Sequence, residues 1–328
     1  MRSDPAIRVV HYRYWIMPVV AATVLAVAAL ALLGFYGGRP ARAATGSPVV
    51  VGAGDIASCS STGDEATAKL LANIAGTVLA LGDNAYMEGS PAQFNNCYDP
   101  TWGQYKARTM PVVGNHEYRT PGASGYFGYF GDKATGVVDP DTGTKMGYYS
   151  YDLGSWHIIA LNSECEYWAT GFIDGPSQCS TQKQANMEAW LKADLAQNPA
   201  ACTLAYFHQP RFSSGGGGND LETQPLWDAL YEANADVVLA GHDHVYERFA
   251  PQTPTGQRDD ARGIREFVVG TGGVDHGRFN NIKANSQVRN ATAFGVLKLT
   301  LDPTSYTWKF VPQAGKSFTD SGTTNCHS

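Results

Sequence analysis

Short apolar runs, each followed at once by a polar cluster, constrain the fold of this chain most strongly. Five such runs lie at 48–53, 77–81, 110–113, 201–207 and 235–240. Each has the length of a buried strand, and a further strand is expected at 265–270. The amphipathic stretches predicted as helices are 63–74, 181–197 and 223–234. This alternation favours an α/β fold with buried strands.

Two other parts of the chain favour antiparallel pairing. The expected pairs are 147–153 with 156–162, and 293–300 with 305–312. Mixed sheets covered by helices on both outer faces accommodate both kinds of pattern. The chain of 328 residues contains no internal repeat and no convincing linker between domains. We therefore expect a single domain after the N-terminal segment.

The polar clusters carry side chains that suit metal ions. In chain order they supply Asp55, Asp83 with Tyr86, Asn115 with His116, His208, and His242 with His244. Loops at the carboxyl ends of strands converge on one crevice in α/β sheets, so we expect these side chains to meet. Carboxylate, phenolate, amide and imidazole donors suit Fe, Mn or Zn. One Gly-Asp pair after a strand more often caps a helix, but five clusters in this order favour a metal site.

At these residues the sequence resembles the calcineurin-like metallophosphoesterase superfamily, and within it the purple acid phosphatases. The general superfamily pattern has a histidine two residues after the first aspartate, where this chain has Ala57. Tyr86 stands three residues after Asp83, as in the purple acid phosphatase pattern. The segments 208–210 and 245–248 also resemble that branch, and the likeness extends over 55–312.

The resemblance implies a four-layer α-β-β-α sandwich of two mixed sheets. It also implies two metal ions, a ferric ion and a divalent Zn, Fe or Mn ion. The first would be held by Asp55, Tyr86 and His244, the second by Asn115, His208 and His242, with Asp83 bridging them. His116 is similar to the family's substrate-facing imidazole, which contacts phosphate or assists the leaving group.

One position departs from the family pattern. Purple acid phosphatases commonly carry a second active-site histidine nine residues beyond the equivalent of His208, and this chain has Gly217 there. His276 is a candidate replacement from another loop, or else a surface histidine. Tyr126 lies in the aromatic-rich segment 118–147, which forms either a wall over the site or a segment packed onto the domain.

The resemblance implies hydrolysis of phosphomonoesters by attack of a metal-bound hydroxide. Two alternatives stay open at this point. A phosphodiesterase or nucleotidase would use the same metal site on a different substrate. A non-catalytic cell-surface binding protein would keep the fold and use the metals structurally.

The N-terminal segment differs from the rest of the chain. Arg2, Arg8 and Arg13 precede an uncharged stretch over 14–38, which is followed by small residues ending near Ala43. This is typical of a secretory signal, although the apolar stretch is also long enough to stay in a bilayer. We expect 1–43 to be a signal peptide or membrane anchor. We expect 44–328 to be one catalytic domain, secreted or otherwise outside the cytoplasm.

Charge and cysteine content agree with export and limit the partners. Residues 44–328 carry 19 Lys and Arg against 29 Asp and Glu, a net charge of about −10. Such a surface repels nucleic acid and anionic lipid, so we expect no nucleic-acid partner, and membrane contact only through the N-terminal segment. The small phosphorylated substrate that the resemblance implies would have to be attracted locally, by the bound metal ions. The six cysteines form no C-x-x-C pair and predict up to three disulfides, for which Cys165 with Cys179 is our best single expectation.

Overall fold

The computed structural model describes residues 46–164 and 181–327, and every structural statement below concerns this part of the chain. Two units are distinguished, Met1–Ala44 and Thr45–Ser328, and all of the described elements belong to the second. The predicted signal or anchor at 1–43 therefore lies outside the described residues. Within 46–164 and 181–327, no helix has the length and apolar character needed to cross a bilayer.

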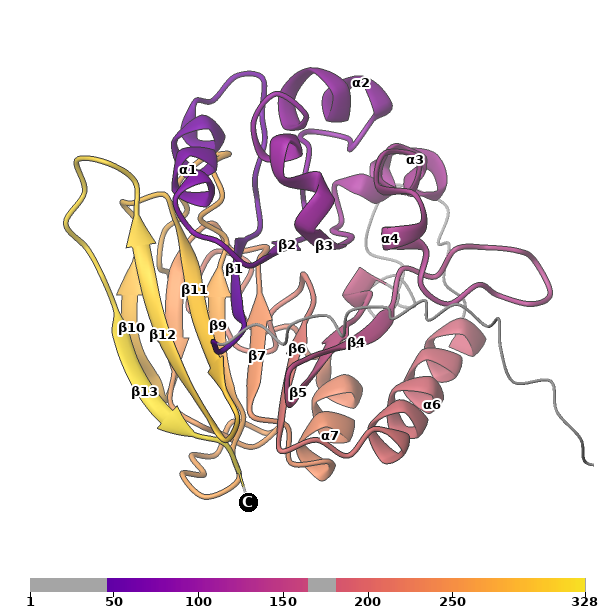
Figure 1. The fold of residues 1–328 in the computed structure, drawn as a ribbon, viewed down its shortest axis with the longest axis vertical. Helices are drawn as coiled ribbons and strands as arrows, with labels where there is room; N and C mark the ends of the chain where they lie inside the picture. The colour runs from indigo at the N-terminus through magenta and orange to yellow at the C-terminus, as the bar shows by residue number, and fades with distance from the viewer. Residues whose placement is uncertain (1–45, 165–180, 328) are drawn as a thin grey trace, which may run out of the picture. The chain divides into compact units, whose positions relative to one another are not determined.

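Two mixed β-sheets form the centre of this unit (Figure 1). The six-stranded sheet has the order β13-β12-β11-β1-β2-β3. Its strands are β1 (Val49–Ala53), β2 (Thr77–Leu81), β3 (Thr109–Val112), β11 (Gly295–Asp302), β12 (Ser305–Pro312) and β13 (Ser321–Asn325). The strands β1, β2 and β3 run parallel, whereas β11 pairs antiparallel with β1.

The seven-stranded sheet has the order β10-β8-β9-β7-β6-β5-β4. Its strands are β4 (Tyr149–Leu153), β5 (Trp156–Ala160), β6 (Cys202–Tyr206), β7 (Val237–Ala240), β8 (Tyr246–Phe249), β9 (Arg265–Val269) and β10 (Ser286–Asn290). The strands β5, β6, β7 and β9 are parallel. Every predicted strand and both antiparallel pairs are confirmed, with ends that agree within two residues.

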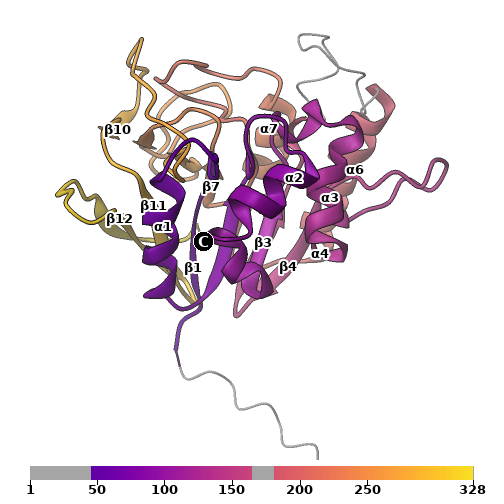
Figure 2. The same cartoon turned by 90° about the horizontal axis from the view of Figure 1, so that it is seen from above.

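Helices cover both sheets. The α-helices are α1 (Gly63–Ala72), α2 (Pro91–Gln93), α3 (Ser124–Phe130), α4 (Asp132–Thr135), α6 (Thr181–Gln197) and α7 (Gln224–Glu232). Shorter turns of π or 3₁₀ helix are η1 (Phe94–Tyr98), η2 (Trp102–Arg108), η3 (Glu117–Arg119) and η4 (Pro121–Ala123). On the six-stranded sheet, α1 packs beside β11 and α4 beside β3, and Figure 2 shows α2 and α3 between α1 and α6. The three predicted helices are confirmed as α1, α6 and α7.

Side-chain packing accounts for the layers. Met187 and Leu191 of α6 and Leu226, Trp227 and Leu230 of α7 are buried in one cluster with residues of β5, β6 and β7. Ala68 and Leu71 of α1 belong to a second cluster, which fills the space between the two sheets and beneath α1. The chain therefore has the expected four-layer α-β-β-α architecture of two mixed sheets.

Two disulfides fasten the described residues. Cys59–Cys97 joins the loop after β1 to η1, and Cys202–Cys326 joins β6 to the residues after β13. Asp236 lies close to the second pair, but cysteines in a disulfide offer no thiolate to a metal ion. The predicted pairing of Cys165 with Cys179 lies outside the described residues.

A buried carboxyl group in α1 should make the stability of the fold depend on pH. Asp64 is 2% exposed, accepts a hydrogen bond from Thr101 Oγ1 at 2.8 Å, and has no partner for Oδ1 among the described residues. Burial raises the pKa of Asp64 from 3.8 to about 7. At pH values between 3.8 and about 7, the folded chain therefore keeps a proton on Asp64 that the unfolded chain loses. The free energy of unfolding should then fall by on the order of a few kcal/mol as the pH rises through this range.

We expect Asp64→Asn to remove this dependence. Thermal unfolding of the variant and of the wild type at pH 4 and at pH 8 tests the expectation, because the variant should gain stability relative to the wild type at the higher pH. Identical pH dependence of the two proteins would contradict it.

Candidate metal centre

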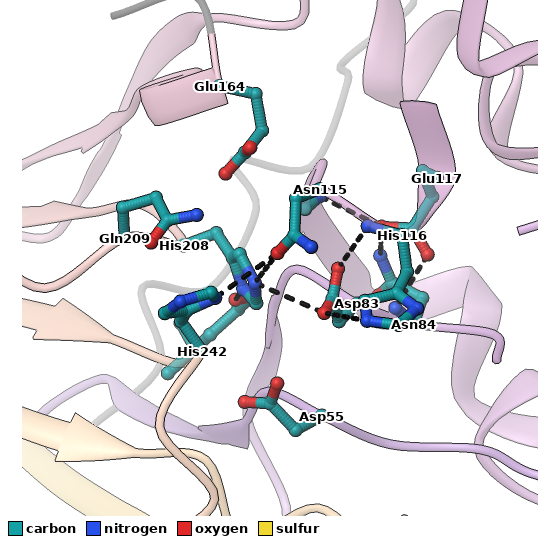
Figure 3. A network of polar contacts seen from close by, with 12 residues as sticks. Asp55, Asp83, Asn84, Asn115, His116, Glu117, Glu164, His208, Gln209 and His242 are labelled. Atoms are coloured by element: carbon teal, nitrogen blue, oxygen red, sulfur yellow. Dashed lines mark hydrogen bonds and ion pairs between the residues drawn. The ribbon is translucent and has the colours of Figure 1, made fainter. Parts of the chain in front are cut away.

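The predicted ligands lie at the carboxyl ends of strands from both sheets (Figure 3). Asp55, Asp83 and Asn115 follow β1, β2 and β3, while His208 and His242 follow β6 and β7. Asp55, Asp83 and His242 have φ angles of 61°, 47° and 67°. Residues other than glycine rarely adopt positive φ angles, because the conformation is strained by about 1–3 kcal/mol per residue. Such strain persists only where the surrounding structure requires it. Three strained residues at one strand-end cluster therefore indicate a functional site.

A first group of donor atoms comes from Asp55, Tyr86 and His244. The Tyr86 hydroxyl lies 2.8 Å from Asp55 Oδ1 and 3.1 Å from His244 Nε2. His244 Nε2 in turn lies 3.3 Å from Asp55 Oδ1. These are the three residues that the sequence assigns to the first ion.

A second group of donor atoms comes from Asn115, His208 and His242. Asn115 Oδ1 lies 3.1 Å from His208 Nε2 and 3.1 Å from His242 Nδ1, as the dashed lines in Figure 3 mark. The two imidazole rings meet edge to face, with centroids 5.2 Å apart. These are the three residues assigned to the second ion.

Asp83 lies between the two groups. Its Oδ2 accepts a hydrogen bond from the Tyr86 hydroxyl at 2.9 Å and lies 3.3 Å from His208 Nε2. Ligand atoms of Asp55, Asp83 and His208 all fall within 4.8 Å of one another. The structure thus brings the seven predicted ligands together as two groups with one shared carboxylate.

The donor atoms fit metal ions because they present lone pairs to one another. His208 Nδ1 donates to the Leu81 carbonyl at 2.9 Å, so in the neutral, metal-binding form of the ring the lone pair of Nε2 would point toward Asn115 Oδ1. The single hydroxyl proton of Tyr86 faces the carboxylates of both Asp55 and Asp83. Asp55 Oδ2 is buried without a hydrogen-bond partner among the described residues. Such a site needs positive charge, and its oxygen and nitrogen donors suit Fe, Mn or Zn.

Without an ion, the site satisfies this need by taking up protons. Burial alone would lower the pKa of His208, but the carboxylates of Asp83 and Asp55 raise it well above its usual range. Burial likewise opposes protonation of His244, yet Asp55 and Asp275 raise its pKa to about 9. Burial and the carboxylates of Asp55 and Asp83 raise the pKa of Tyr86 well above 10, so its phenolate requires a neighbouring cation. Metal ions must therefore displace protons here.

His116 stands at the edge of the donor groups. Its Nδ1 donates to the Met87 carbonyl at 2.6 Å, and its backbone N–H donates to Asp83 Oδ1 at 2.8 Å. The ring lies 4.4 Å from that of Tyr86, and Nε2 is 3.8 Å from the shared oxygen, Asp83 Oδ2. The Met87 carbonyl therefore fixes the ring so that Nε2 faces the point where the two groups meet.

Asp275 was not found by sequence reasoning, yet it contacts a predicted ligand. His244 Nδ1 donates to Asp275 Oδ1, which fixes the tautomer that directs Nε2 at the first group. Asp275 lies 31 residues beyond His244, and nothing in its local sequence marks it.

Replacing Asp275 should weaken metal binding without unfolding the protein. We expect Asp275→Asn to lower the affinity for the first ion about 10- to 100-fold, as is usual for such outer partners. Asp152→Asn is a matched control, because Asp152 is an equally exposed partner of the remote His157. Calorimetric metal titration of both variants checks this, and equal affinities would contradict the role of Asp275.

Gly217 stands where the family pattern has a histidine, and its main chain lies close to a predicted ligand. Its backbone N–H donates to Asp243 Oδ1 at 2.7 Å. A Cβ atom on Gly217 would lie 3.1 Å from His242 Nε2. The main chain itself packs against a predicted ligand, so a side chain would crowd that imidazole.

Two further candidates take other places. The ring of His276 stacks on Phe294 with centroids 4.0 Å apart, and burial together with Lys316 lowers its pKa. Tyr126 is fully buried and donates to the Pro111 carbonyl at 3.1 Å, so it has no surface to offer a substrate. The aromatic segment around Tyr126 packs onto the domain, which is the second of the two expected arrangements.

Known proteins are similar to this chain in sequence and in fold. The model of the calcineurin-like phosphoesterase family matches residues 49–246. Purple acid phosphatase 23 of Arabidopsis thaliana is 30% identical over 173 residues, which cover 48% of this chain and 34% of that protein. Purple acid phosphatase 15 of the same plant is 24% identical over 209 residues, covering 55% of this chain and 37% of that protein. The chain thus spans about a third of the length of these curated relatives.

A solved structure of purple acid phosphatase PPD1 from yellow lupin seeds superposes with a TM-score of 0.62 at 21% identity, covering 85% of this chain and 54% of that one. Its likeness shows the fold. The family match over 49–246 shows that this chain belongs to the calcineurin-like phosphoesterase family, and its similarity to the plant relatives supports the purple acid phosphatase-like branch.

Proposed function

We propose that this chain hydrolyses phosphomonoesters at a dinuclear metal centre. The observation that carries the proposal is the division of seven donor residues into two groups that share Asp83 Oδ2. Asp55, Tyr86 and His244 would hold one ion, and Asn115, His208 and His242 the other. Membership of a phosphoesterase family supports the reaction class.

The two groups favour different ions. Tyr86 offers a phenolate, whose high pKa in the ion-free site calls for a strongly charged cation, so we propose ferric iron there. Two imidazoles and an amide oxygen suit a divalent Zn, Fe or Mn ion. A tyrosinate bound to ferric iron should colour the protein, so a colourless protein with full activity would refute this assignment of the metals.

Bound ions would neutralise charge on the phosphoryl oxygens and lower the pKa of water near them. The protein's own contribution is orientation and proton transfer. The Met87 carbonyl holds the His116 ring so that Nε2 faces the shared carboxylate. When the ring is an imidazolium, it would donate the proton on Nε2 to the departing oxygen of the substrate. Gly217 supplies no second imidazole, which leaves His116 as the proposed proton donor.

Phosphodiesters and nucleotides remain alternative substrates for the same donor groups. A non-catalytic role is the alternative from another class. The structure titled GAP50, the anchor in the inner membrane complex of Plasmodium, superposes with a TM-score of 0.65 at 15% identity, covering 86% of this chain and 90% of that one. That likeness concerns the fold, whereas the full donor set and His116 favour catalysis in this chain.

We further propose that residues 44–328 act outside the cytoplasm as one catalytic domain. Two disulfides within the described residues support an oxidising compartment. The N-terminal sequence would serve as the signal or anchor.

Hydrolysis of monoester and diester reporters across pH, before and after removal of metal, tests the proposal. We expect the monoester to be hydrolysed faster, and chelation to abolish hydrolysis until metal is restored. Hydrolysis that survives complete removal of metal would contradict the mechanism, and a metal-loaded protein that hydrolyses neither ester would favour the binding role.

A further inference from the structure

Glu117 is a wholly buried acidic residue directly beside the candidate metal centre (Figure 3). It is not one of the predicted ligands. Its Oε1 accepts hydrogen bonds from the backbone N–H groups of Asn84 at 2.8 Å and Ala85 at 3.2 Å. Its Oε2 accepts one from the backbone N–H of Gly114 at 2.8 Å. One side chain therefore satisfies three backbone donors.

These donors belong to the two loops that carry ligands from the six-stranded sheet. Asn84 and Ala85 separate the shared ligand Asp83 from Tyr86, in the loop after β2. Gly114 immediately precedes Asn115 in the loop after β3. Glu117 thus binds the main chain of both loops at once, one with each carboxylate oxygen.

The two loops also touch each other directly, where Gly114 packs against Asp83. A Cβ atom on Gly114 would lie 2.2 Å from Asp83 Oδ1 and 2.3 Å from the Asp83 backbone nitrogen. Two hydrogen bonds also join this region, from His116 N–H to Asp83 Oδ1 at 2.8 Å and from Asn84 Nδ2 to the Val112 carbonyl at 3.1 Å. The spacing of the loops therefore depends on this close packing, on these two bonds and on Glu117, whose side chain bonds to the main chain of both loops.

We infer that Glu117 is a positioning residue of the metal centre, which holds Asp83 and Tyr86 in register with Asn115 by fixing the spacing of the two loops. The inference rests on the proposed function, since it assigns Glu117 a role toward the ions. Its chemistry requires both carboxylate oxygens as acceptors. The amide of Gln offers one acceptor oxygen, so its –NH₂ group would face N–H donors of one loop and release that side.

The chain offers a matched control at Glu266. This carboxylate is also wholly buried, and its two oxygens accept from the backbone N–H groups of Arg211 at 2.9 Å and Phe212 at 3.0 Å. Both donors lie next to each other in the loop after β6, so Glu266 does not join two loops that carry predicted ligands. Glu266→Gln therefore reproduces the loss of a buried carboxylate without releasing two ligand loops from each other.

Two measurements on the full chain test the inference, with Zn²⁺ as the probe. In competition titrations, Glu117→Gln should bind the second Zn²⁺ about 10- to 100-fold more weakly than the wild type, whereas Glu266→Gln should bind it like the wild type. In the metal-free protein, hydrogen exchange should accelerate in Glu117→Gln at the amide of Gly114 or at those of Asn84 and Ala85.

Equal Zn²⁺ affinity of the two variants, or unchanged exchange at all three amides, would overturn the inference. If Glu117→Gln does not fold, Glu117→Asp is tested in its place under the same criteria. If neither variant folds while Glu266→Gln does, Glu117 is required for folding and the inference is overturned. A wild-type protein that binds two Zn²⁺ ions but hydrolyses no ester would refute the proposed function alone. The exchange measurement does not depend on catalysis.

Discussion

Asp83→Asn should lose metal and hydrolytic activity together. Asp83 Oδ2 contacts Tyr86 of the first donor group at 2.9 Å and His208 of the second at 3.3 Å, so both groups lose their shared ligand and one negative charge. We expect the metal content to fall from two ions per chain to one or none. We also expect phosphomonoester hydrolysis to fall by a factor on the order of 10³ or more. Elemental analysis and an activity assay on the same preparation measure both.

Asp194→Asn is the control for this variant. Asp194 Oδ2 also bonds a buried imidazole, that of His157 at 2.8 Å, but in a contact between α6 and β5 away from the donor groups. The control should keep two ions and near-normal turnover even if its melting temperature falls. Full activity and full metal content in Asp83→Asn would refute the shared-ligand assignment.

His116→Gln should lose turnover but keep its metal. His116 Nε2 faces Asp83 Oδ2 at 3.8 Å without belonging to either donor group, so its loss removes a proton donor and leaves both ligand sets intact. We expect turnover to fall about 10²- to 10⁴-fold with alkyl phosphates, whose leaving oxygen needs a proton. The fall should be smaller with p-nitrophenyl phosphate, because p-nitrophenolate leaves readily without one.

The rival proton donor is His276. Its stacking on Phe294 predicts that His276→Gln has a weaker effect than His116→Gln. If His276→Gln showed the larger and more leaving-group-dependent fall in turnover, the assignment to His116 would be wrong. A loss of metal from His116→Gln would also contradict it.

The fold was largely predictable because local sequence governs most of it. Each of the runs at 48–53, 77–81 and 235–240 is apolar on both faces, as a strand covered by layers on either side requires. A glycine directly follows each of these strands and the strand at 110–113, and it marks the strand end at which a candidate ligand comes next: Asp55, Asp83, Asn115 or His242. The strands β8, β10 and β13 were not predicted, since they are polar or partly exposed and follow no strong apolar run.

The supports of the site could not be read from local sequence. Asp275 reaches His244 only because the segment after β9 returns along the site, with Gly277 N–H donating to the His244 carbonyl at 2.8 Å. Glu117 resembles any acidic residue in the first turn of a helix, and its role depends on the parallel pairing of β2 with β3. Gly217 could be recognised as a departure, but its contact with His242 follows from the packing of its loop.

The most direct test of the account is anomalous diffraction from crystals of the metal-loaded protein. Two peaks per chain are expected on either side of Asp83 Oδ2, one bounded by Asp55, Tyr86 and His244 and the other by Asn115, His208 and His242. A single peak, or peaks that avoid these donor groups, would contradict the dinuclear centre.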